Sequence, residues 1–164
     1  MNQHFLTFSL REERFAVNIL KVREIIPYSG VAKVPLVADH IRGVINLHGN
    51  VVAVIDPSVR LGKAPGDPVS RACILIMDIE SQDENLEIGL LVDAVNEVTH
   101  IHAEDIEPPP DFGTGIRKDF IQGMVGGKEG FVIILDVDRF LSPEELSRYR
   151  GHEIEEFNYI EIHS

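Results

Sequence analysis

Short apolar runs, broken by glycine, proline and charged residues, recur along this chain of 164 residues. Residues 4–10 and 15–17 mix aliphatic and aromatic side chains with threonine and serine, which strands tolerate. Residues 11–14, between these two runs, are all charged. We therefore predict a β-hairpin with a solvated tip near the start of the chain.

The hydrophobic period changes after this hairpin. Ile19, Val22 and Ile26 are spaced at i, i+3 and i+7, which predicts a short helix over residues 19–26. Asn18 is a suitable N-cap, and Pro27 ends the helix because a residue before proline is driven out of the α region. Two helical turns are not stable alone, so we expect this helix to pack on a sheet.

The later apolar runs predict further strands, joined by glycine-containing turns. A two-residue turn at Gly49 and Asn50 joins the first pair, since these residue types accept the backbone of a tight hairpin. Ser142 and Pro143 begin a predicted C-terminal helix that ends before Gly151, and an acidic tail follows. Regularly spaced short strands favour a mainly β fold of small barrels or a sandwich. The predicted strands are residues 41–47, 51–56, 72–79, 86–92, 121–125 and 131–136.

Composition and charge narrow the class of protein. A hydrophobic fraction of 44% and a charged fraction of 26% are ordinary for a soluble globular domain. The net charge of −12 disfavours nucleic acid or an anionic membrane surface as the main partner. Cys73 is the single cysteine, so no internal disulfide can form. No signal peptide and no apolar stretch of about 20 residues is present, so we expect a cytoplasmic protein that does not insert into a membrane.

Catalytic motifs are missing from the sequence, which contains no GxSxG, HExxH, P-loop or CxxC pattern. His100 and His102 alternate ahead of Glu104, and this spacing could supply metal ligands, although solvated surface histidines explain it more simply. Asp136 and Asp138 could form an acid/base pair, but a capped strand end is the simpler interpretation. We expect no catalysis, no cofactor and no metal. A small metal-dependent β-barrel enzyme stays as the alternative from a different class.

Several segments, taken in order, resemble the CheW-like domain family, the coupling proteins of bacterial chemosensory arrays. The resemblance covers about residues 4–142. Within the second half, Val95 and Val98 follow a matching apolar strand. The matching segments are residues 15–26, Val34 with Pro35, 41–49, 51–56, 88–93, 106–113, 121–123 and 133–137.

The resemblance implies two five-stranded SH3-like β-barrels packed together, with barrel 1 at about 7–73 and barrel 2 at about 1–6 plus 74–142. Residues 143–164 would form the C-terminal helix and tail. It also implies a non-catalytic adaptor that joins a CheA-type histidine kinase to the cytoplasmic tip of chemoreceptors. Such an adaptor is a monomer in isolation and part of receptor–kinase arrays. The chain has no room for a kinase core or a receiver domain, so it resembles the stand-alone form; a coupling protein of a non-flagellar pathway is the nearest alternative.

The family's functional residues are carried over by position. An apolar groove that receives the receptor tip would be lined by Leu6, Ile19, Val22, Ile25 and Val95, although these side chains could instead be core. Aliphatic groove residues with few polar groups disfavour a small-ligand sensor. The regulatory domain of the kinase would contact barrel 1 at Val31, Val34, Pro35, Ile41, Gly43 and Asn46.

One position departs from the family pattern. His48 stands where the family usually has arginine, and the resemblance implies that Glu24 lies beside it as a signalling pair. Arginine is always charged and offers a forked donor set, whereas histidine is charged only when protonated. We therefore expect a weaker, pH-dependent contact between Glu24 and His48. Pro57, after Asp56, also departs from the family pattern and is expected to shorten the preceding strand.

Overall fold

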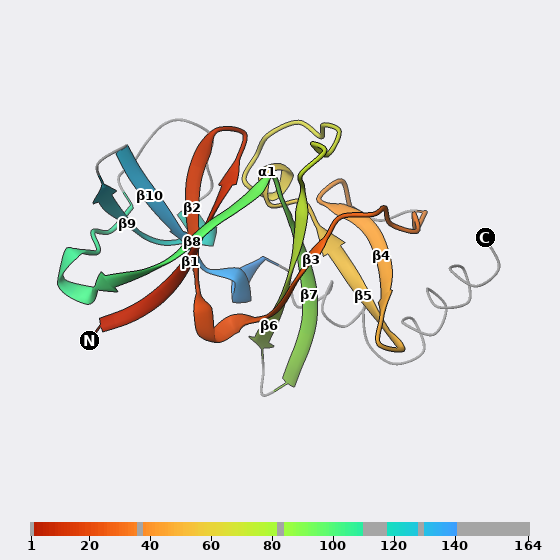
Figure 1. Cartoon of the computed structure of the whole chain (residues 1–164), viewed down its shortest axis with the longest axis horizontal. Coiled ribbons are helices and arrows are strands. Elements are labelled where there is room, and N and C mark those ends of the chain that lie inside the picture. The colour runs from red at the N-terminus through yellow and green to blue at the C-terminus, as the bar shows by residue number, and fades with distance from the viewer. Residues whose placement is uncertain (1, 36–37, 82–83, 110–117, 128–129, 141–164) are drawn as a thin grey trace.

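Ten strands form two five-stranded sheets that lie side by side in a computed structural model of the chain (Figure 1). The structure describes residues 2–35, 38–81, 84–109, 118–127 and 130–140. The predicted C-terminal helix and tail, residues 143–164, lie outside the described residues. In the part of the chain that is described, no helix is long and apolar enough to cross a bilayer.

Sheet A has the strand order β8-β1-β2-β10-β9 and lies on the left in Figure 1. Its neighbours are antiparallel except for β10 and β2, which are parallel. Three 3-10 helices follow its strands: η2 (Ala103–Asp105), η3 (Lys118–Phe120) and η4 (Val137–Arg139). Its strands are β1 (Asn2–Leu10), β2 (Glu13–Asn18), β8 (Ala94–His102), β9 (Ile121–Gly127) and β10 (Gly130–Leu135).

Sheet B has the order β3-β6-β7-β5-β4, again with one parallel pair, β5 and β7. Helix η1 (Ile19–Lys21) connects β2 to this sheet, and α1 (Pro57–Arg60) follows β5. Its strands are β3 (Val22–Pro27), β4 (Ile41–Leu47), β5 (Asn50–Ile55), β6 (Cys73–Ser81) and β7 (Glu84–Val92). The mainly β fold of two five-stranded, SH3-like units is therefore confirmed.

The sheets divide the chain differently from the expected barrel boundaries of 7–73 and 1–6 plus 74–142. Both strands of the N-terminal hairpin belong to sheet A, and β6 and β7 belong to sheet B. The physical reason is non-local pairing. β2 completes sheet A by lying parallel to β10, through Phe15 opposite Ile133 and Ala16 opposite Ile134.

The predicted helix over residues 19–26 is wrong beyond its first turn. Asn18 does cap η1, since its side chain accepts a hydrogen bond from the Leu20 N–H at 2.9 Å. From Val22 onward the chain is strand β3, paired antiparallel with β6. Branched side chains favour an extended backbone, and hydrogen bonds to β6 outweigh the helical spacing.

The tight turn between β4 and β5 lies one residue earlier than predicted. Leu47 pairs with Asn50, which leaves His48 and Gly49 as the two turn residues, with φ of 52° and 87°. Positive φ at both positions is the signature of a type I′ turn. The Asn46 Oδ1 accepts the Gly49 N–H at 3.1 Å and supports this turn. As expected, β5 ends before Pro57, at Ile55; Asp56 then caps α1, with Pro57 at its first position.

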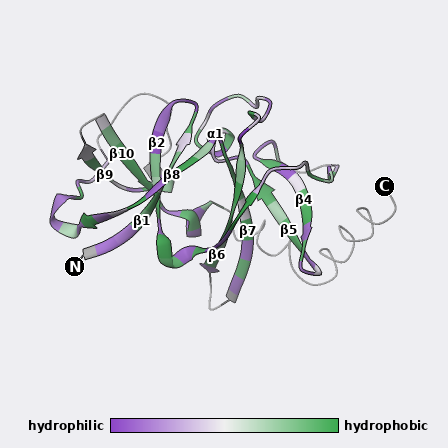
Figure 2. Cartoon of the chain, viewed as in Figure 1, coloured by the Kyte–Doolittle hydropathy of each residue, from purple (hydrophilic) through white to green (hydrophobic). Residues whose placement is uncertain are grey.

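The hydrophobic core lies mainly between the sheets. A joint core combines residues of both sheets, such as Phe8 and Phe15 of sheet A with Leu75 and Leu90 of sheet B. Each sheet also carries a smaller apolar cluster that involves its other face. Figure 2 shows apolar residues along the strands, whereas the turn between β1 and β2 is hydrophilic. Burial of both faces explains why β6 and β7 read as nearly continuous apolar runs.

Candidate functional site

The edge strand β3 of sheet B and the edge strand β8 of sheet A each contain a β-bulge. In β3, Val22 pairs with Met77, but Glu24 already pairs with Ile76, so one residue of β3 is extra. The bulge therefore places Val22 and Ile25 on the same face although they are three residues apart. Their strand partners on β6, Met77 and Leu75, belong to the joint core. Val22 is half-buried and Ile25 is 45% exposed.

The bulge in β8 has the same consequence. Leu6 pairs with Val98 and Phe8 pairs with Val95. Two residues of β8 therefore lie opposite the single residue Thr7 of β1. Val95 and Val98 consequently face the same side as Leu6 and Phe8, which belong to the joint core. Val95 is half-buried and packs on that core, whereas Val98 is 53% exposed.

Thr7 holds the β8 bulge in place. Its side chain is buried (3% exposed), and its hydroxyl donates to the Glu97 carbonyl at 3.0 Å and accepts the Glu97 N–H at 3.2 Å. These bonds satisfy backbone groups that the bulge removes from the regular ladder. The hydroxyl of Thr7 therefore fixes the geometry that brings Val95 and Val98 together.

Thr7→Val is expected to lower the free energy of unfolding by about 1–2 kcal/mol. Valine keeps the shape of threonine but leaves two backbone groups of Glu97 without their partner. Urea denaturation measures the change, and Thr99→Val on β8 is the matched control because no hydrogen bond of the Thr99 hydroxyl is observed among the described residues. Equal stability of both variants would contradict this role of Thr7.

We name the edge surface the exposed or half-buried apolar residues of η1, together with those of β3 and β8 whose strand partners belong to the joint core. Helix η1 connects sheet A to β3 and contacts β1, the neighbour of β8. Leu20, at the centre of η1, is 85% exposed. Exposed apolar side chains of this kind are typical of protein-binding surfaces. The edge surface consists of Ile19, Leu20, Val22, Ile25, Val95 and Val98.

The structure places four of the five predicted receptor-binding residues on the edge surface. Leu6 is the exception: at 3% exposed it belongs to the joint core, because β1 lies between β8 and β2 in the interior of sheet A. Sequence reasoning missed Leu20 and Val98 as site residues. The available signal for Leu20 was an apolar residue two positions after the N-cap Asn18. Val98 is hidden by strict alternation, since the bulge is not visible in the sequence.

The six predicted kinase-binding residues separate into two groups. Ile41 and Gly43 are buried in β4 and have structural roles. Pro35 and Asn46 are exposed, and Val31 and Val34 are half-buried and pack on the cores. The four accessible residues lie on β4 and on the segment before it, which pairs with β4 through Ala32 and Val44.

Glu24 and His48 lie beside each other, as predicted. The His48 Nε2 is 3.3 Å from both carboxylate oxygens of Glu24. The side chains are 74% and 39% exposed for His48 and Glu24, so water screens the pair and its contribution to stability is small. The pair connects the turn after Asn46 to edge strand β3.

The carboxylates near the end of the described chain have structural contacts. Burial, followed by the charge of Asp138, raises the pKa of Asp136. The Asp138 carboxylate forms an ion pair with the Lys21 Nζ at 3.1 Å and accepts a hydrogen bond from the Glu80 N–H at 2.9 Å. These contacts connect η4 to η1 and β6. The His100 ring stacks on His4, with ring centroids 4.9 Å apart, and His102 is tilted against His100. No group of three potential metal ligands is found among the described residues.

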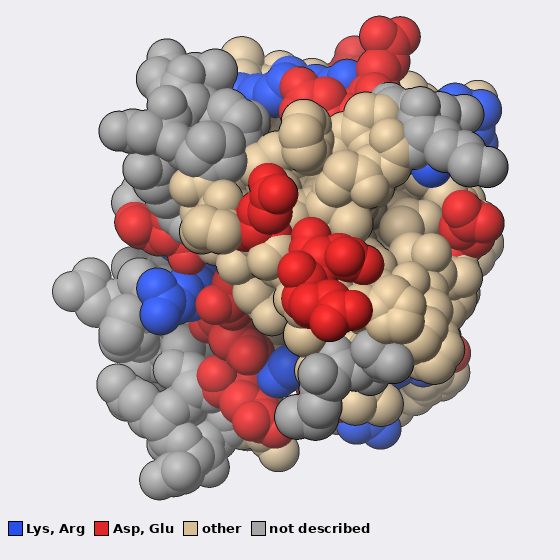
Figure 3. All heavy atoms as spheres, turned by 90° about the vertical axis from the view of Figure 1, so that its left-hand side faces the viewer, with Lys and Arg blue, Asp and Glu red and all other residues tan. Residues whose placement is uncertain are grey.

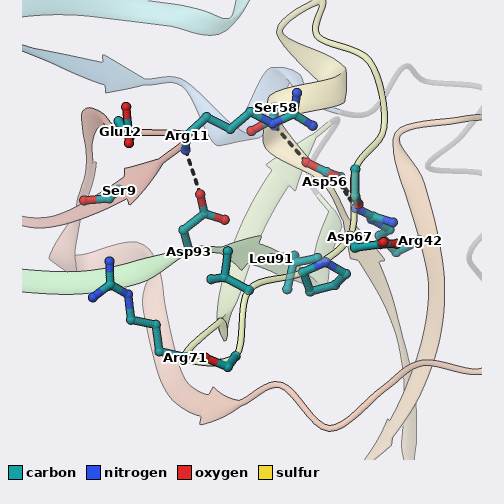
Figure 4. A pocket seen from close by; sticks show the side chains of 14 residues that line it. Ser9, Arg11, Glu12, Arg42, Asp56, Ser58, Asp67, Arg71, Leu91 and Asp93 are labelled. Atoms are coloured by element: carbon teal, nitrogen blue, oxygen red, sulfur yellow. Dashed lines mark hydrogen bonds and ion pairs between the residues drawn. The ribbon is translucent and has the colours of Figure 1, made fainter.

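A cavity of about 730 Å³ lies where the turn between β1 and β2 meets sheet B (Figure 4). Its charged groups are largely committed to the fold. The Arg42 Nη2 lies 3.0 Å from the Asp56 carboxylate, which also accepts the Ser58 N–H at 3.0 Å. The Arg11 N–H donates to Asp93 at 2.7 Å. We therefore assign this cavity a structural role in joining the two sheets.

Comparison with known proteins gives consistent results. The family model of the CheW-like domain matches residues 4–145, which include every strand of both sheets except the first two residues of β1. The chemotaxis protein CheW of Klebsiella aerogenes is 30% identical over 147 residues, covering 90% of this chain and 86% of that protein. The chemotaxis protein CheW of Rhizobium meliloti is 30% identical over 143 residues, covering 87% and 90%. The crystal structure of the scaffolding protein TtCheW from Thermoanaerobacter tengcongensis has a TM-score of 0.76 at 32% identity, covering 87% of this chain and 89% of that chain.

Proposed function

Because this chain belongs to the CheW-like domain family, we propose that it is a non-catalytic adaptor that couples chemoreceptors to a CheA-type histidine kinase in bacterial chemotaxis. The observation that carries the proposal is the edge surface, where two bulged strands and η1 present apolar side chains to solvent. The names of the relatives favour chemotaxis over a non-flagellar pathway or a metal-dependent enzyme.

The receptor tip, a helical hairpin, is the proposed ligand of the edge surface. An amphipathic helix binds by laying an apolar stripe against apolar side chains of its partner. Val22 and Ile25 on β3, with Val95 and Val98 on β8, offer such a contact from the two sides of the joint core. Leu20 adds the most exposed large apolar side chain of the surface.

The regulatory domain of the kinase is the proposed ligand of β4 and of the segment that precedes it. Pro35 and Asn46 are exposed there, beside the half-buried Val31 and Val34. The exposed side chains of Leu20, Ile25 and Val98 are not part of this surface and stay available to a second partner. One molecule could therefore hold a kinase and a receptor at the same time, as an adaptor must.

Calorimetric titration with the regulatory domain of a CheA-type kinase from the same organism tests this function. We expect binding in the micromolar range or tighter. Pro35→Asp should weaken it, whereas Val69→Asp should not, because Val69 is exposed but belongs to neither proposed surface. If no such kinase binds, the proposed coupling function is wrong, although the fold stands.

We expect receptor-dependent kinase activation to increase in the His48→Arg variant. Arginine is always charged and offers a forked donor set to the Glu24 carboxylate, whereas His48 presents only its Nε2 to that carboxylate. Kinase assays with receptor membranes compare the two proteins. Equal activation would show that the pair has no part in signalling.

A further inference from the structure

The described strands cross between the two sheets at two points. Sheet A holds β1, β2, β8, β9 and β10, whereas sheet B holds β3 to β7, so the crossings follow β2 and β7. The first crossing is η1, and the second is the single residue Asp93, between Val92 of β7 and Ala94 of β8. One half of the edge surface, η1 with β3, belongs to the first crossing, and the other half, β8, follows the second. The relative position of the two halves therefore depends on how the crossings are held.

The second crossing is held by contacts of Asp93 with the hairpin of β1 and β2. The Asp93 N–H donates to the Ser9 carbonyl at 2.9 Å, and its carboxylate accepts the Arg11 N–H at 2.7 Å. Arg11 has a φ of 48°, a left-handed conformation that is costly for a residue with a Cβ. Its guanidinium donates to the Ala64 carbonyl, in the segment between α1 and β6 (Figure 1). Backbone strain of this kind persists where the surrounding structure requires it, and here it connects the crossing to segments of both sheets.

The first crossing is held by the carboxylate of Asp138. This residue lies in η4, which follows β10 of sheet A. Its ion pair with Lys21 reaches η1, and its hydrogen bond from the Glu80 N–H reaches β6 of sheet B. Asp138 therefore joins the end of sheet A to the first crossing and to sheet B at the same time.

These two carboxylates differ from other acidic side chains of the chain. The sequence contains 27 acidic residues, and Figure 3 shows several of them exposed on the end of the molecule that lies on the left in Figure 1. A carboxylate alone therefore indicates no role. Asp93 and Asp138 each accept a backbone N–H from an element other than their own, and a hydrogen bond to a charged acceptor is stronger than a neutral one.

We propose that Asp93 and Asp138 are positioning residues for receptor binding. Each holds one crossing, so together they fix β8 relative to η1 and β3. The two halves of the edge surface are then presented to the receptor tip in one arrangement, and a pre-arranged surface binds more tightly because less ordering is needed on association. This role, which rests on the proposed coupling function, does not extend to the kinase surface, since β4 and the segment paired with it are not divided by a crossing.

Alanine substitutions separate the two partners. Asp93→Ala and Asp138→Ala should each weaken binding of a receptor-tip fragment to the full chain about fivefold and leave the affinity for the kinase regulatory domain unchanged. Asp93→Asn keeps an oxygen that accepts the Arg11 N–H, so it should retain the affinity of the unmodified protein. Asp78→Ala is the matched control: Asp78 is 33% exposed, like Asp138, but its ion pair with Arg23 joins two strands of sheet B. Calorimetry measures both affinities.

Residual dipolar couplings of the free proteins test the same role without a ligand, because they report the orientation of sheet A relative to sheet B. We expect this orientation to change in both alanine variants and to stay unchanged in the control. Unchanged orientation or unchanged receptor affinity in both variants would overturn the inference. So would an equal loss for receptor and kinase, or the same loss in the control, since either would indicate a merely structural effect. Failure of the unmodified protein to bind the receptor tip would overturn the proposed function together with this inference.

Discussion

Val98→Asp is expected to weaken binding of the chemoreceptor tip at least tenfold while the protein stays folded. Val98 is 53% exposed, so the carboxylate is solvated in the free protein and the fold tolerates it. In the complex, the same carboxylate would be buried against an apolar helix without a partner, which is costly. A tenfold loss corresponds to about 1.4 kcal/mol of binding free energy. Ile25→Asp, on the other bulged strand, should have a similar effect.

Val69→Asp provides the matched control for this experiment. Val69 is 44% exposed, so the same substitution is made at a similar exposure but outside the edge surface. Binding to a receptor fragment is measured by calorimetry, and circular dichroism confirms that each variant is folded. Unchanged receptor affinity in both Val98→Asp and Ile25→Asp would exclude the edge surface as the receptor site.

Gly43→Ala is expected to destabilise the fold by about 3 kcal/mol. Gly43 has a φ of 152°, and an added Cβ would lie 2.3 Å from the Ala32 carbonyl oxygen. The Ala32 backbone lies so close to Gly43 because Ala32 forms a β-bridge with the next residue, Val44. In this bridge, the N–H of each residue donates to the carbonyl of the other at 2.9 Å. The alanine methyl would force the two segments apart and break a buried part of sheet B, an overpacking effect of about 1–3 kcal/mol to which backbone strain adds.

Gly30→Ala separates strain from crowding. Gly30 has a φ of 108°, but no atom lies within 4 Å of an added Cβ, so only the cost of an unfavourable φ applies, about 1–2 kcal/mol. Urea denaturation of both variants measures the difference. Equal stabilities would mean that Gly43 is not required by packing. If Gly43→Ala is the less stable variant, a loss of kinase binding in it reports on the fold and not on a direct contact of Gly43.

The hairpins and the mainly β class could be predicted from the sequence because they depend on local signals. Alternating side chains and glycine turns mark the strands, and Asn18 marks the cap of η1. The turn at His48 was placed one residue late because asparagine at position 50 is also a good turn residue. The assignment of strands to sheets failed where it depends on the parallel pairing of β2 with β10, which leaves no local signal.

The site was predicted in part for a related reason. A bulge changes which residues share a face, and neither bulge can be recognised from spacing alone. The spacing of Ile19, Val22 and Ile26 predicts a helix, whereas the bulge in β3 places Val22 on the same face as Ile25. In β8, the same effect concealed Val98. The contact between Glu24 and His48 was anticipated only because the chain resembles a family in which those positions are paired.

The most direct test of the proposed coupling is recruitment of a CheA-type kinase to receptor-containing membranes. Kinase is sedimented with the membranes in the absence of this protein, in its presence, and in the presence of the Val98→Asp variant. The account predicts that kinase sediments in large amount only with the unmodified protein, since only this protein can hold both partners at once. Equal kinase recovery with and without the protein would contradict the account.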